Sequence, residues 1–431
     1  MEEKNVTYKE ILKESEYRKL LFSNVINRFG DSVDAIAFTW LVYQITHNAM
    51  WSAIVFGLNT LPNVLVQPFT GALVERMNKK TVIVFTHIIR AIVIGSFALL
   101  YHFGMVNALV MAIATLVITT IESFNLPADS AFTVQVIKKE HMTSGLSLGK
   151  MLSGAATLVG TGIAGVIIAA WGITPAMFID IATFIIAAVL IAMMKSKETG
   201  KPVSTNAETD DLTKESFTTL FADGIKYVIK TPVVRNFCLL CVALNFMLVP
   251  INALQAPIVE EIFKMGSELL SFAGVFGSIG GIVGASLLPA FSRKFTPLQI
   301  TCMGIASLGL GIFGISLGGF YGGQTIPCYI IASVCFFVMM VSASLMGGVI
   351  GIQFMKSVDA DYMARASAVF NSSATAAMPV GSLLVSLAVS RVSTNSIMIF
   401  SALFAGVVLL VTILTRPVLQ KEEKEELLNA A

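Results

Sequence analysis

Four polar side chains recur at helical spacing in the first long apolar stretch of the chain, namely Asn24, Asn27, Asp31 and Asp34. Spacings of three, four and three residues place all four on one face of a helix. Asp31 would lie about 16 Å along a helix that enters the membrane near Leu20, close to the middle of a ~30 Å hydrocarbon layer. An apolar environment favours the neutral form of a carboxyl group, so Asp31 and Asp34 could bind and release protons near neutral pH.

Other ionisable groups also fall within apolar stretches, where each is a candidate for function. Glu122 is open to two interpretations, a second proton carrier or a partner of Arg90. For Asp31 and Asp34 the alternative to proton coupling is a structural pair with Arg28 or Arg90. We expect a structural ion-pair role for Arg90.

Neutral amides form a second polar pattern, and they either line a wet cavity or hold helices together. The candidates for a substrate cavity are Asn27, Asn59, Asn63, Asn245, Asn252, Gln255 and Asn371. The second half of the chain has no acid inside an apolar stretch. This asymmetry favours a lipophilic or weakly basic solute over a sugar or a polyanion, and 29 Phe and 20 Met would suit varied ligands.

The elements that must position these groups are membrane helices. The chain has 431 residues, of which 55% are hydrophobic and only 13% charged, whereas a soluble domain is about 25% charged. This composition excludes a cytosolic enzyme, a nucleic-acid binder and a disulfide-stabilised secreted scaffold. Twelve continuous apolar segments are expected, approximately at 20–45, 50–74, 81–102, 105–127, 145–170, 173–195, 236–259, 268–291, 298–318, 324–346, 364–388 and 395–415.

Charge placement predicts how these segments are organised. Lys and Arg concentrate in the tails, in alternate loops and in the polar stretch 196–234, which puts both termini in the cytoplasm. A shift of 217 residues aligns Arg18 with Arg235 and Arg76 with Arg293, which indicates a twofold repeat. We therefore expect a six-helix bundle at 1–195, a cytoplasmic linker with a short amphipathic helix at 196–234, and a second six-helix bundle with a short tail at 235–431.

The loop after the second segment reads GALVERMNKK, from Gly71 to Lys80. Gly71 would let a helix end approach its neighbour closely, and Glu75 could accept bonds from Arg76 or from a helix N-terminus. With Lys79 and Lys80, these residues would form a gate on the cytoplasmic side. An ordinary positively charged loop would explain the lysines but not the order of residue types.

This loop resembles the signature of the major facilitator superfamily, with Glu75 where Asp is usual. More of the chain resembles its macrolide-efflux and enterobactin-exporter-like branch, including 17–33, 61–80, 124–148, 178–190, 353–370 and 378–384. His87 departs from the branch, which usually has Asp there, and Thr161 replaces the usual Pro of an antiporter glycine motif. The resemblance implies an all-α fold of twelve transmembrane helices in two pseudo-symmetric bundles, with the first helix lining a central cavity.

The predicted function is export of a small lipophilic or amphipathic compound, drug-like or macrolide-like, by proton antiport with alternating access. The alternative is an exporter of a siderophore, a lysolipid or another metabolite. No phosphate-binding loop, catalytic group or metal-ligand cluster stands out, so no enzyme activity, cofactor or metal is expected. The expected partners are a small molecule, protons and the bilayer of the inner or plasma membrane, with no nucleic acid, and the protein is expected to be a monomer.

Overall fold

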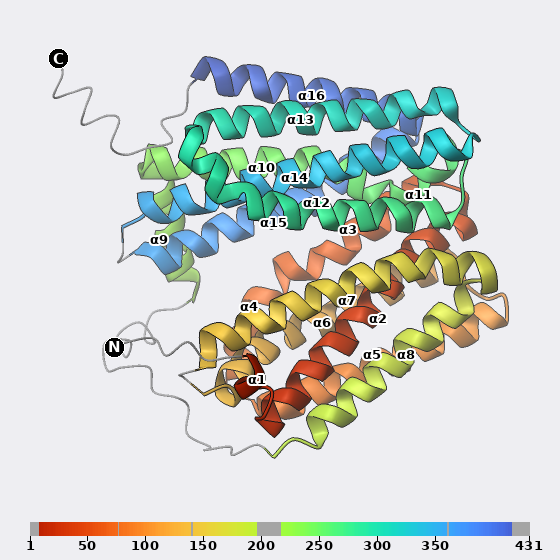
Figure 1. Ribbon diagram of the computed structural model, residues 1–431, viewed down its shortest axis with the longest axis vertical. Helices are drawn as coiled ribbons and strands as arrows, with labels where there is room; N and C mark the ends of the chain where they lie inside the picture. The colour runs from red at the N-terminus through yellow and green to blue at the C-terminus, as the bar shows by residue number, and fades with distance from the viewer. Residues whose placement is uncertain (1–7, 76, 139–140, 196–216, 360–361, 416–431) are drawn as a thin grey trace. The chain divides into compact units, whose positions relative to one another are not determined.

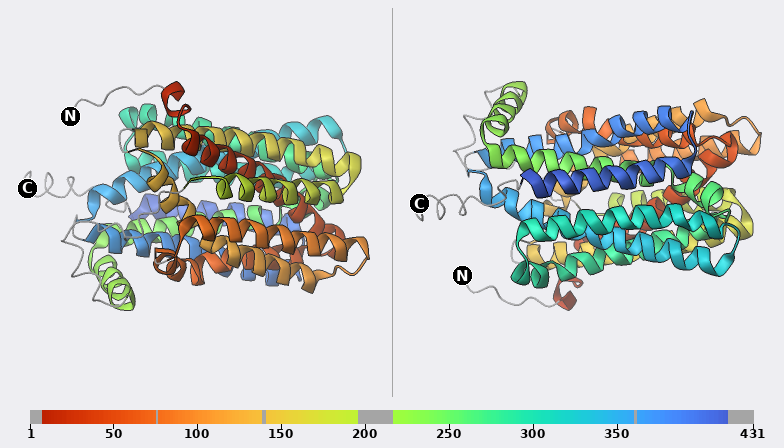
Figure 2. Two further views of the ribbon diagram at one scale, coloured as in Figure 1. Left: turned by 90° about the horizontal axis from the view of Figure 1, so that it is seen from below. Right: turned by 90° about the horizontal axis from the view of Figure 1, so that it is seen from above.

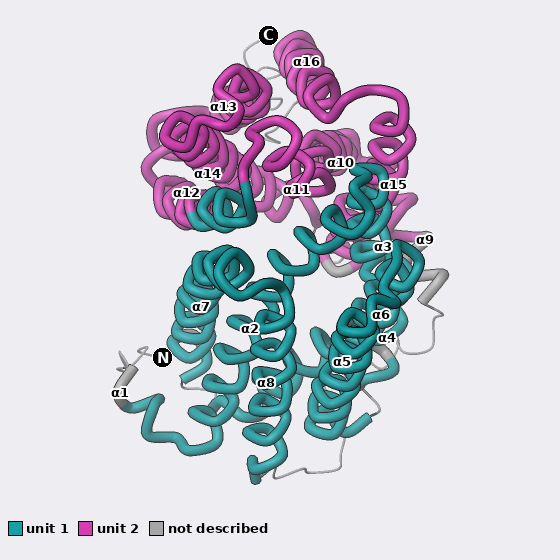
Figure 3. Tube along the Cα trace, turned by 90° about the vertical axis from the view of Figure 1, so that its right-hand side faces the viewer, with its two compact units in different colours: residues 1–203, 266–275 teal, residues 204–265, 276–431 magenta. Residues whose placement is uncertain are grey.

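The computed structural model describes residues 8–75, 77–138, 141–195, 217–359 and 362–415, and every regular element in these ranges is helical. The chain divides into two compact units (Figure 3). Unit 1 comprises residues 1–203 and 266–275, and unit 2 comprises residues 204–265 and 276–431.

Unit 1 is made of helices that run alongside one another (Figures 1 and 2). They are α1 (Tyr8–Ile11), α2 (Ser15–Thr46), α3 (Ala49–Leu65), α4 (Gln67–Glu75), α5 (Lys79–His102), α6 (Ala108–Val136), α7 (Met142–Trp171) and α8 (Ile173–Ala192). The start of α12 clusters with this unit.

Local sequence signals explain where several of these helices begin and end. Asn48, Asn78 and Asn107 each precede a helix, and their side-chain oxygens accept bonds of 2.8 to 3.0 Å from backbone N–H groups of the first turn. This satisfies donors that the helix itself leaves unpaired. Gly172 separates α7 from α8 with φ of 81°, a conformation that favours glycine.

The segment predicted at 50–74 is not one helix. It divides at Val66 into α3 and α4, and the N–H of Val66 still bonds to the carbonyl of Pro62 at 2.8 Å. Pro68 has no N–H to donate to the preceding turn, so a continuous helix would lose a bond there. The second predicted segment is therefore formed by two helices, α3 and α4.

Helix α2 is the centre of unit 1 and packs against both α7 and α8. Two glycines permit these contacts. A Cβ added at Gly30 would lie 2.9 Å from Asp180 Oδ1 on α8, and one added at Gly160 on α7 would lie 2.7 Å from the carbonyl oxygen of Phe29 on α2. Helix α5 packs on α6 and α8, and α3 packs on α6.

Unit 2 contains a second set of long helices (Figure 1). They are α9 (Phe217–Lys230), α10 (Pro232–Ala253), α11 (Gln255–Pro257), the π-turn η2 (Ile258–Ile262), α12 (Ser267–Lys294), α13 (Pro297–Gly318), the 3₁₀ turn η3 (Gly319–Tyr321), α14 (Thr325–Ser357), α15 (Met363–Val389) and α16 (Thr394–Thr415). Helix α13 packs on α14 and α16, and α10 packs on α15. Helix α9 is the short helix expected within the polar stretch 196–234, and it packs on α15.

Ten helices of the described residues are long and apolar enough to cross a membrane. Helix α2 is long enough but carries Arg28, Asp31 and Asp34, and α3 has only 17 residues. Large apolar side chains stand exposed along many helices, among them Leu310 and Trp171 at 70% each. Such a surface fits lipid rather than water. The all-α membrane class is confirmed, and the count of twelve spans stays a prediction.

Candidate functional site

The polar face of α2 meets α5 inside unit 1. Arg90 Nη2 forms an ion pair of 2.9 Å with Asp31 Oδ1, and the two side chains are 6% and 16% exposed. Asn27 Nδ2 donates to the other carboxylate oxygen of Asp31 at 2.9 Å. Asp31 is therefore held on both oxygens, and the guanidinium of Arg90 has a charged partner in a low-dielectric interior.

Helix α8 forms the other wall around Arg90. The guanidinium carbon of Arg90 lies 4.2 Å from the centroid of the Phe184 ring, within cation–π range. The ring of His87, one turn before Arg90 on α5, lies 5.8 Å from the same Phe184 ring. In the described part of the chain, Arg90 Nε and His87 Nδ1 are buried without a hydrogen-bond partner.

Asp180 lies one turn before Phe184 on α8, so it shares the face that Arg90 contacts. Its exposed fraction is 0%, and among the described residues neither carboxylate oxygen has a hydrogen-bond partner. The hydroxyl of Thr183 donates to the backbone carbonyl of Asp180 at 2.7 Å. Gly30 packs directly against this pair from α2.

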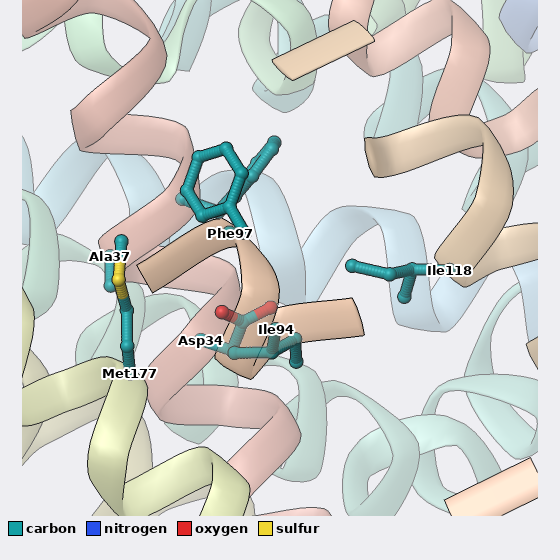
Figure 4. Close-up of a pocket in the computed structure, with 7 residues that line it drawn as sticks. Asp34, Ala37, Ile94, Phe97, Ile118 and Met177 are labelled. Carbon is teal, nitrogen blue, oxygen red and sulfur yellow. The ribbon is translucent and has the colours of Figure 1, made fainter. Parts of the chain in front are cut away.

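Asp34 opens onto a small pocket within unit 1. Figure 4 shows its carboxylate directed into a space bordered by Ile94, Phe97 and Ile118. The complete lining is Asp34, Ala37, Phe38, Ile94, Phe97, Ile118 and Met177, drawn from α2, α5, α6 and α8. The cavity volume is about 10 Å³, room for about one water molecule. This is far below the volume of small-molecule pockets, so in the arrangement described the space beside Asp34 holds no substrate group.

Glu122 on α6 completes an acidic cluster around one cation. Asp31, Glu122, Asp180 and Asp34 all act electrostatically on Arg90. The structure thus brings together the three predicted proton carriers, the predicted structural arginine, and Asp180. Arg90 and Arg28, which also acts on Glu122, are fewer than the four carboxylates, and an unpaired ionised carboxylate is strongly disfavoured in such an interior. The cluster can therefore hold exchangeable protons.

The predicted cavity amides lie in different units. Asn27, Asn59 and Asn63 belong to unit 1, where Asn59 is exposed and Asn63 is half-buried. Asn245, Asn252, Gln255 and Asn371 belong to unit 2. Asn245 Nδ2 donates to the carbonyl of Cys241 in its own helix at 2.9 Å, so this amide bonds within α10. A substrate-contacting role for these residues stays a prediction.

The predicted gate motif is only partly described. Gly71 lies within α4, and a Cβ added there would meet no described heavy atom within 4 Å. Its role in a gate stays a prediction. Arg76 and the side chain of Glu75 lie outside the described residues. Lys79 and Lys80 begin α5, and Lys80 Nζ donates to the carbonyl of Met194 after α8 at 2.7 Å. Lys80 therefore ties α5 to α8 within unit 1.

Sequence reasoning assigned no functional role to two residues at this site. Phe184 stands in a continuous apolar run and carries no signal of its own. Asp180 is an isolated acid in the same run, and as an ionisable group in an apolar helix it was a candidate for which the sequence favoured a structural role. Among the described residues, no three or more His, Cys, Asp or Glu side chains are arranged to hold a metal ion.

Comparison with known proteins identifies the family of this chain. The family model described as Major Facilitator Superfamily matches residues 20–381. Macrolide efflux protein A of Streptococcus pyogenes is 23% identical over 364 residues, covering 84% of this chain and 86% of that protein. The multidrug efflux pump Tap of Mycolicibacterium fortuitum is 23% identical, covering 68% of this chain and 71% of that protein.

Solved structures share the fold. The nucleoside transporter NupG superposes with a TM-score of 0.73 at 12% identity, covering 92% of this chain and 98% of that one. A bacterial homologue of the iron transporter ferroportin in an inward-facing state superposes with a TM-score of 0.69 at 13% identity, covering 94% and 99%. At such identities the likeness concerns the fold alone.

Proposed function

The chain belongs to the major facilitator superfamily, and from this premise we propose that it exports a small lipophilic or amphipathic compound by proton antiport with alternating access. Membership of this family makes the chain a multi-pass membrane transporter rather than an enzyme. The direction of transport and the drug-like or macrolide-like substrate are supported by relatives that are named efflux proteins.

The observation that carries proton coupling is the excess of acids over cations inside unit 1. Asp31 is paired with Arg90, whereas Asp34 faces an apolar pocket and Glu122 acts on the same guanidinium. The protonation of a buried carboxyl group depends on its contact with water and with nearby charges. Alternating access would change both, because the helices around the group move between two conformations. Each transport cycle would then exchange substrate for one or more protons.

The chemistry of the residues around Asp34, a carboxylate among aromatic and aliphatic side chains, favours a weakly basic, lipophilic group on a substrate that reaches them when the helices open. The rings of Phe38 and Phe97 lie 5.7 Å apart and border the same space as the carboxylate. Aromatic faces and a carboxylate together attract an alkylated ammonium group. The remaining amides would contact the rest of the molecule as hydrogen-bond donors and acceptors.

The placement of Lys and Arg supports a location in the inner or plasma membrane with both termini in the cytoplasm. The family fold supports a monomer as the transporting unit, because each chain carries both helical bundles of the family. In this orientation, the loop from Gly71 to Lys80 would act as the cytoplasmic gate.

The test uses purified full-length protein in liposomes that contain a pH-sensitive dye. We expect addition of a lipophilic amine or a macrolide to move protons, and a protonophore to abolish substrate accumulation. The Asp31→Asn, Asp34→Asn double variant should lose proton movement. Asp223→Asn changes a half-buried acid on α9 that pairs with Lys226, and it should behave as native.

Two results would contradict the proposal. Equal proton-driven efflux for the native protein and the double variant would remove the acids from the coupling step. Proton movement with a siderophore, a lysolipid or another metabolite, but not with amines or macrolides, would replace the substrate class by the second candidate.

A further inference from the structure

Asp180 is a buried acid that the proposed coupling scheme does not use. It is 0% exposed on α8, and both carboxylate oxygens are buried without a hydrogen-bond partner among the described residues. An ionised carboxylate without partners is not stable in such a place. In the arrangement seen here, burial therefore favours the neutral form of the Asp180 carboxyl group.

Arg90 faces Asp180 with bonding capacity to spare. Its Nη2 is bound to Asp31 on α2, but its Nε has no partner among the described residues. Its guanidinium lies 4.2 Å above Phe184, one turn from Asp180 on the same face of α8. The planar guanidinium carries five N–H donors in fixed directions, so it can pair with a carboxylate from either helix.

The two carboxylates differ in their access to solvent. The side chain of Asp31 is 16% exposed, whereas Asp180 is sealed between α2 and α8 by Gly30 and Thr183. Asp34 lies one turn from Asp31 on α2, and also one turn from Gly30, where an added Cβ would lie 2.9 Å from Asp180 Oδ1. Asp34 is thus positioned as an intermediate stop between the sealed acid and the more exposed one.

We propose that Asp180 is the alternate ion-pair partner of Arg90, and that a proton passes from Asp180 through Asp34 to Asp31 when the guanidinium exchanges one carboxylate for the other. The O–H bond of Asp180 breaks and an O–H bond forms on Asp31. Arg90 stays protonated throughout, so the total charge of the cluster does not change. The use of this step in transport rests on the proposed proton antiport, whereas the exchange itself is a property of unit 1.

The other charged groups facing this site fit the exchange. His87 contributes a second ring beside Phe184 on α5, and Glu122 approaches Arg90 from α6. Arg28 acts on Glu122 and so gives that acid a second cation. Asp180 has no such second cation, because Arg90 is the one cation acting on it among the described residues. Ionisation of Asp180 therefore draws on Arg90, whose charge now balances Asp31.

Infrared difference spectroscopy on the purified full-length protein in lipid tests the exchange directly. A protonated carboxyl group has a carbonyl stretching band that an ionised carboxylate lacks. We expect native protein to show one such band that disappears in Asp180→Asn, and Asp223→Asn to keep it. If Asp180→Asn does not fold, Asp180→Glu assigns the band by shifting its frequency.

The decisive variant is Asp31→Asn, which leaves Asp180 intact but removes the present partner of Arg90. The exchange predicts that Arg90 then pairs with Asp180, so the Asp180 band is lost although that residue is unchanged. A purely structural Asp180 would keep its proton and its band. Persistence of the band in Asp31→Asn, or its absence from native protein, would overturn the proposal.

Transport measurements in liposomes test whether the exchange is used. Asp180→Asn should lose efflux driven by a proton gradient but retain counterflow, in which substrate exchanges for substrate without net proton movement. Gradient-driven efflux at the native rate would refute a coupling role for Asp180. If native protein shows no proton-driven export at all, the proposed function fails, and the infrared result still decides the exchange.

Discussion

Gly30 is the position where the packing of unit 1 should be most sensitive to one added methyl group. In Gly30→Ala the new Cβ would overlap the side chain of Thr183 and lie 2.9 Å from Asp180 Oδ1. Thr183 cannot turn away freely, because its hydroxyl donates to the carbonyl of Asp180 at 2.7 Å. Helices α2 and α8 must therefore separate or break that bond.

The size of the effect follows from a matched comparison. Gly154→Ala on α7 adds the same methyl group within a helix, where it meets no described heavy atom within 4 Å. The gain in helix propensity is common to both variants, so their difference isolates the overpacking. Overpacking of a well-packed interior costs about 1–3 kcal/mol. For a unit of this size that lowers the unfolding midpoint by roughly 2–4 °C for each kcal/mol.

The assay is thermal unfolding of both variants and the native protein in one detergent at one heating rate, because unfolding of membrane proteins is often irreversible. We expect Gly30→Ala to melt below Gly154→Ala by several degrees. Equal midpoints for the two alanine variants would show that the close contact between α2 and α8 does not exist.

Two further predictions concern the polar ends of the unit 1 helices. Burial opposes ionisation of Glu16, but hydrogen bonds from Lys19 and the N–H of Lys195 outweigh it and lower the pKa of Glu16. Because the folded-state pKa is depressed, this stabilisation is present above the unfolded-state pKa and is lost as pH falls through the folded-state pKa. Glu16→Gln has no such group to protonate. On acidification, the thermal unfolding midpoint should therefore fall more in native protein than in Glu16→Gln. Lys80→Met keeps the aliphatic stem but removes the 2.7 Å hydrogen bond to the carbonyl of Met194. In chemical unfolding, it should lower the free energy of unfolding by about 1 kcal/mol. An unchanged midpoint would mean that the bond does not form.

Much of the architecture could be predicted from local patterns. Long apolar runs separated by polar loops specify membrane helices. In lipid, a single helix pairs all of its own backbone N–H and C=O groups, whereas an isolated extended strand leaves them without hydrogen bonds. Asn78 and Asn107 stand where helices begin, and their amide side chains cap the first turns. The spacing of Asp31 and Asp34 also specifies that they share one face of α2, since a helix repeats every ~3.6 residues.

The break between α3 and α4 shows the limit of the hydropathy pattern. Residues 50–74 read as one apolar segment, but the chain divides at Val66. Hydropathy reports which residues avoid water and is insensitive to one missing backbone donor. Pro68 was the sequence signal for the break, because proline has no N–H to donate to the carbonyl four residues before it. Whether the helix breaks there depends on how neighbouring helices provide that carbonyl with another hydrogen bond.

Local periodicity determines which face of a helix is polar, but not which helix that face will meet. Asp31 and Arg90 are 59 residues apart in the chain, and their pairing depends on how α2 and α5 pack. The isolation of Asp180 depends on Gly30 and Thr183 closing the space between α2 and α8. The same carboxylate in contact with solvent or lipid headgroups would be an ordinary ionised side chain. Only the tertiary packing removes its water and leaves Arg90 as its cation, because desolvation and ion pairing depend on groups that the sequence places far apart.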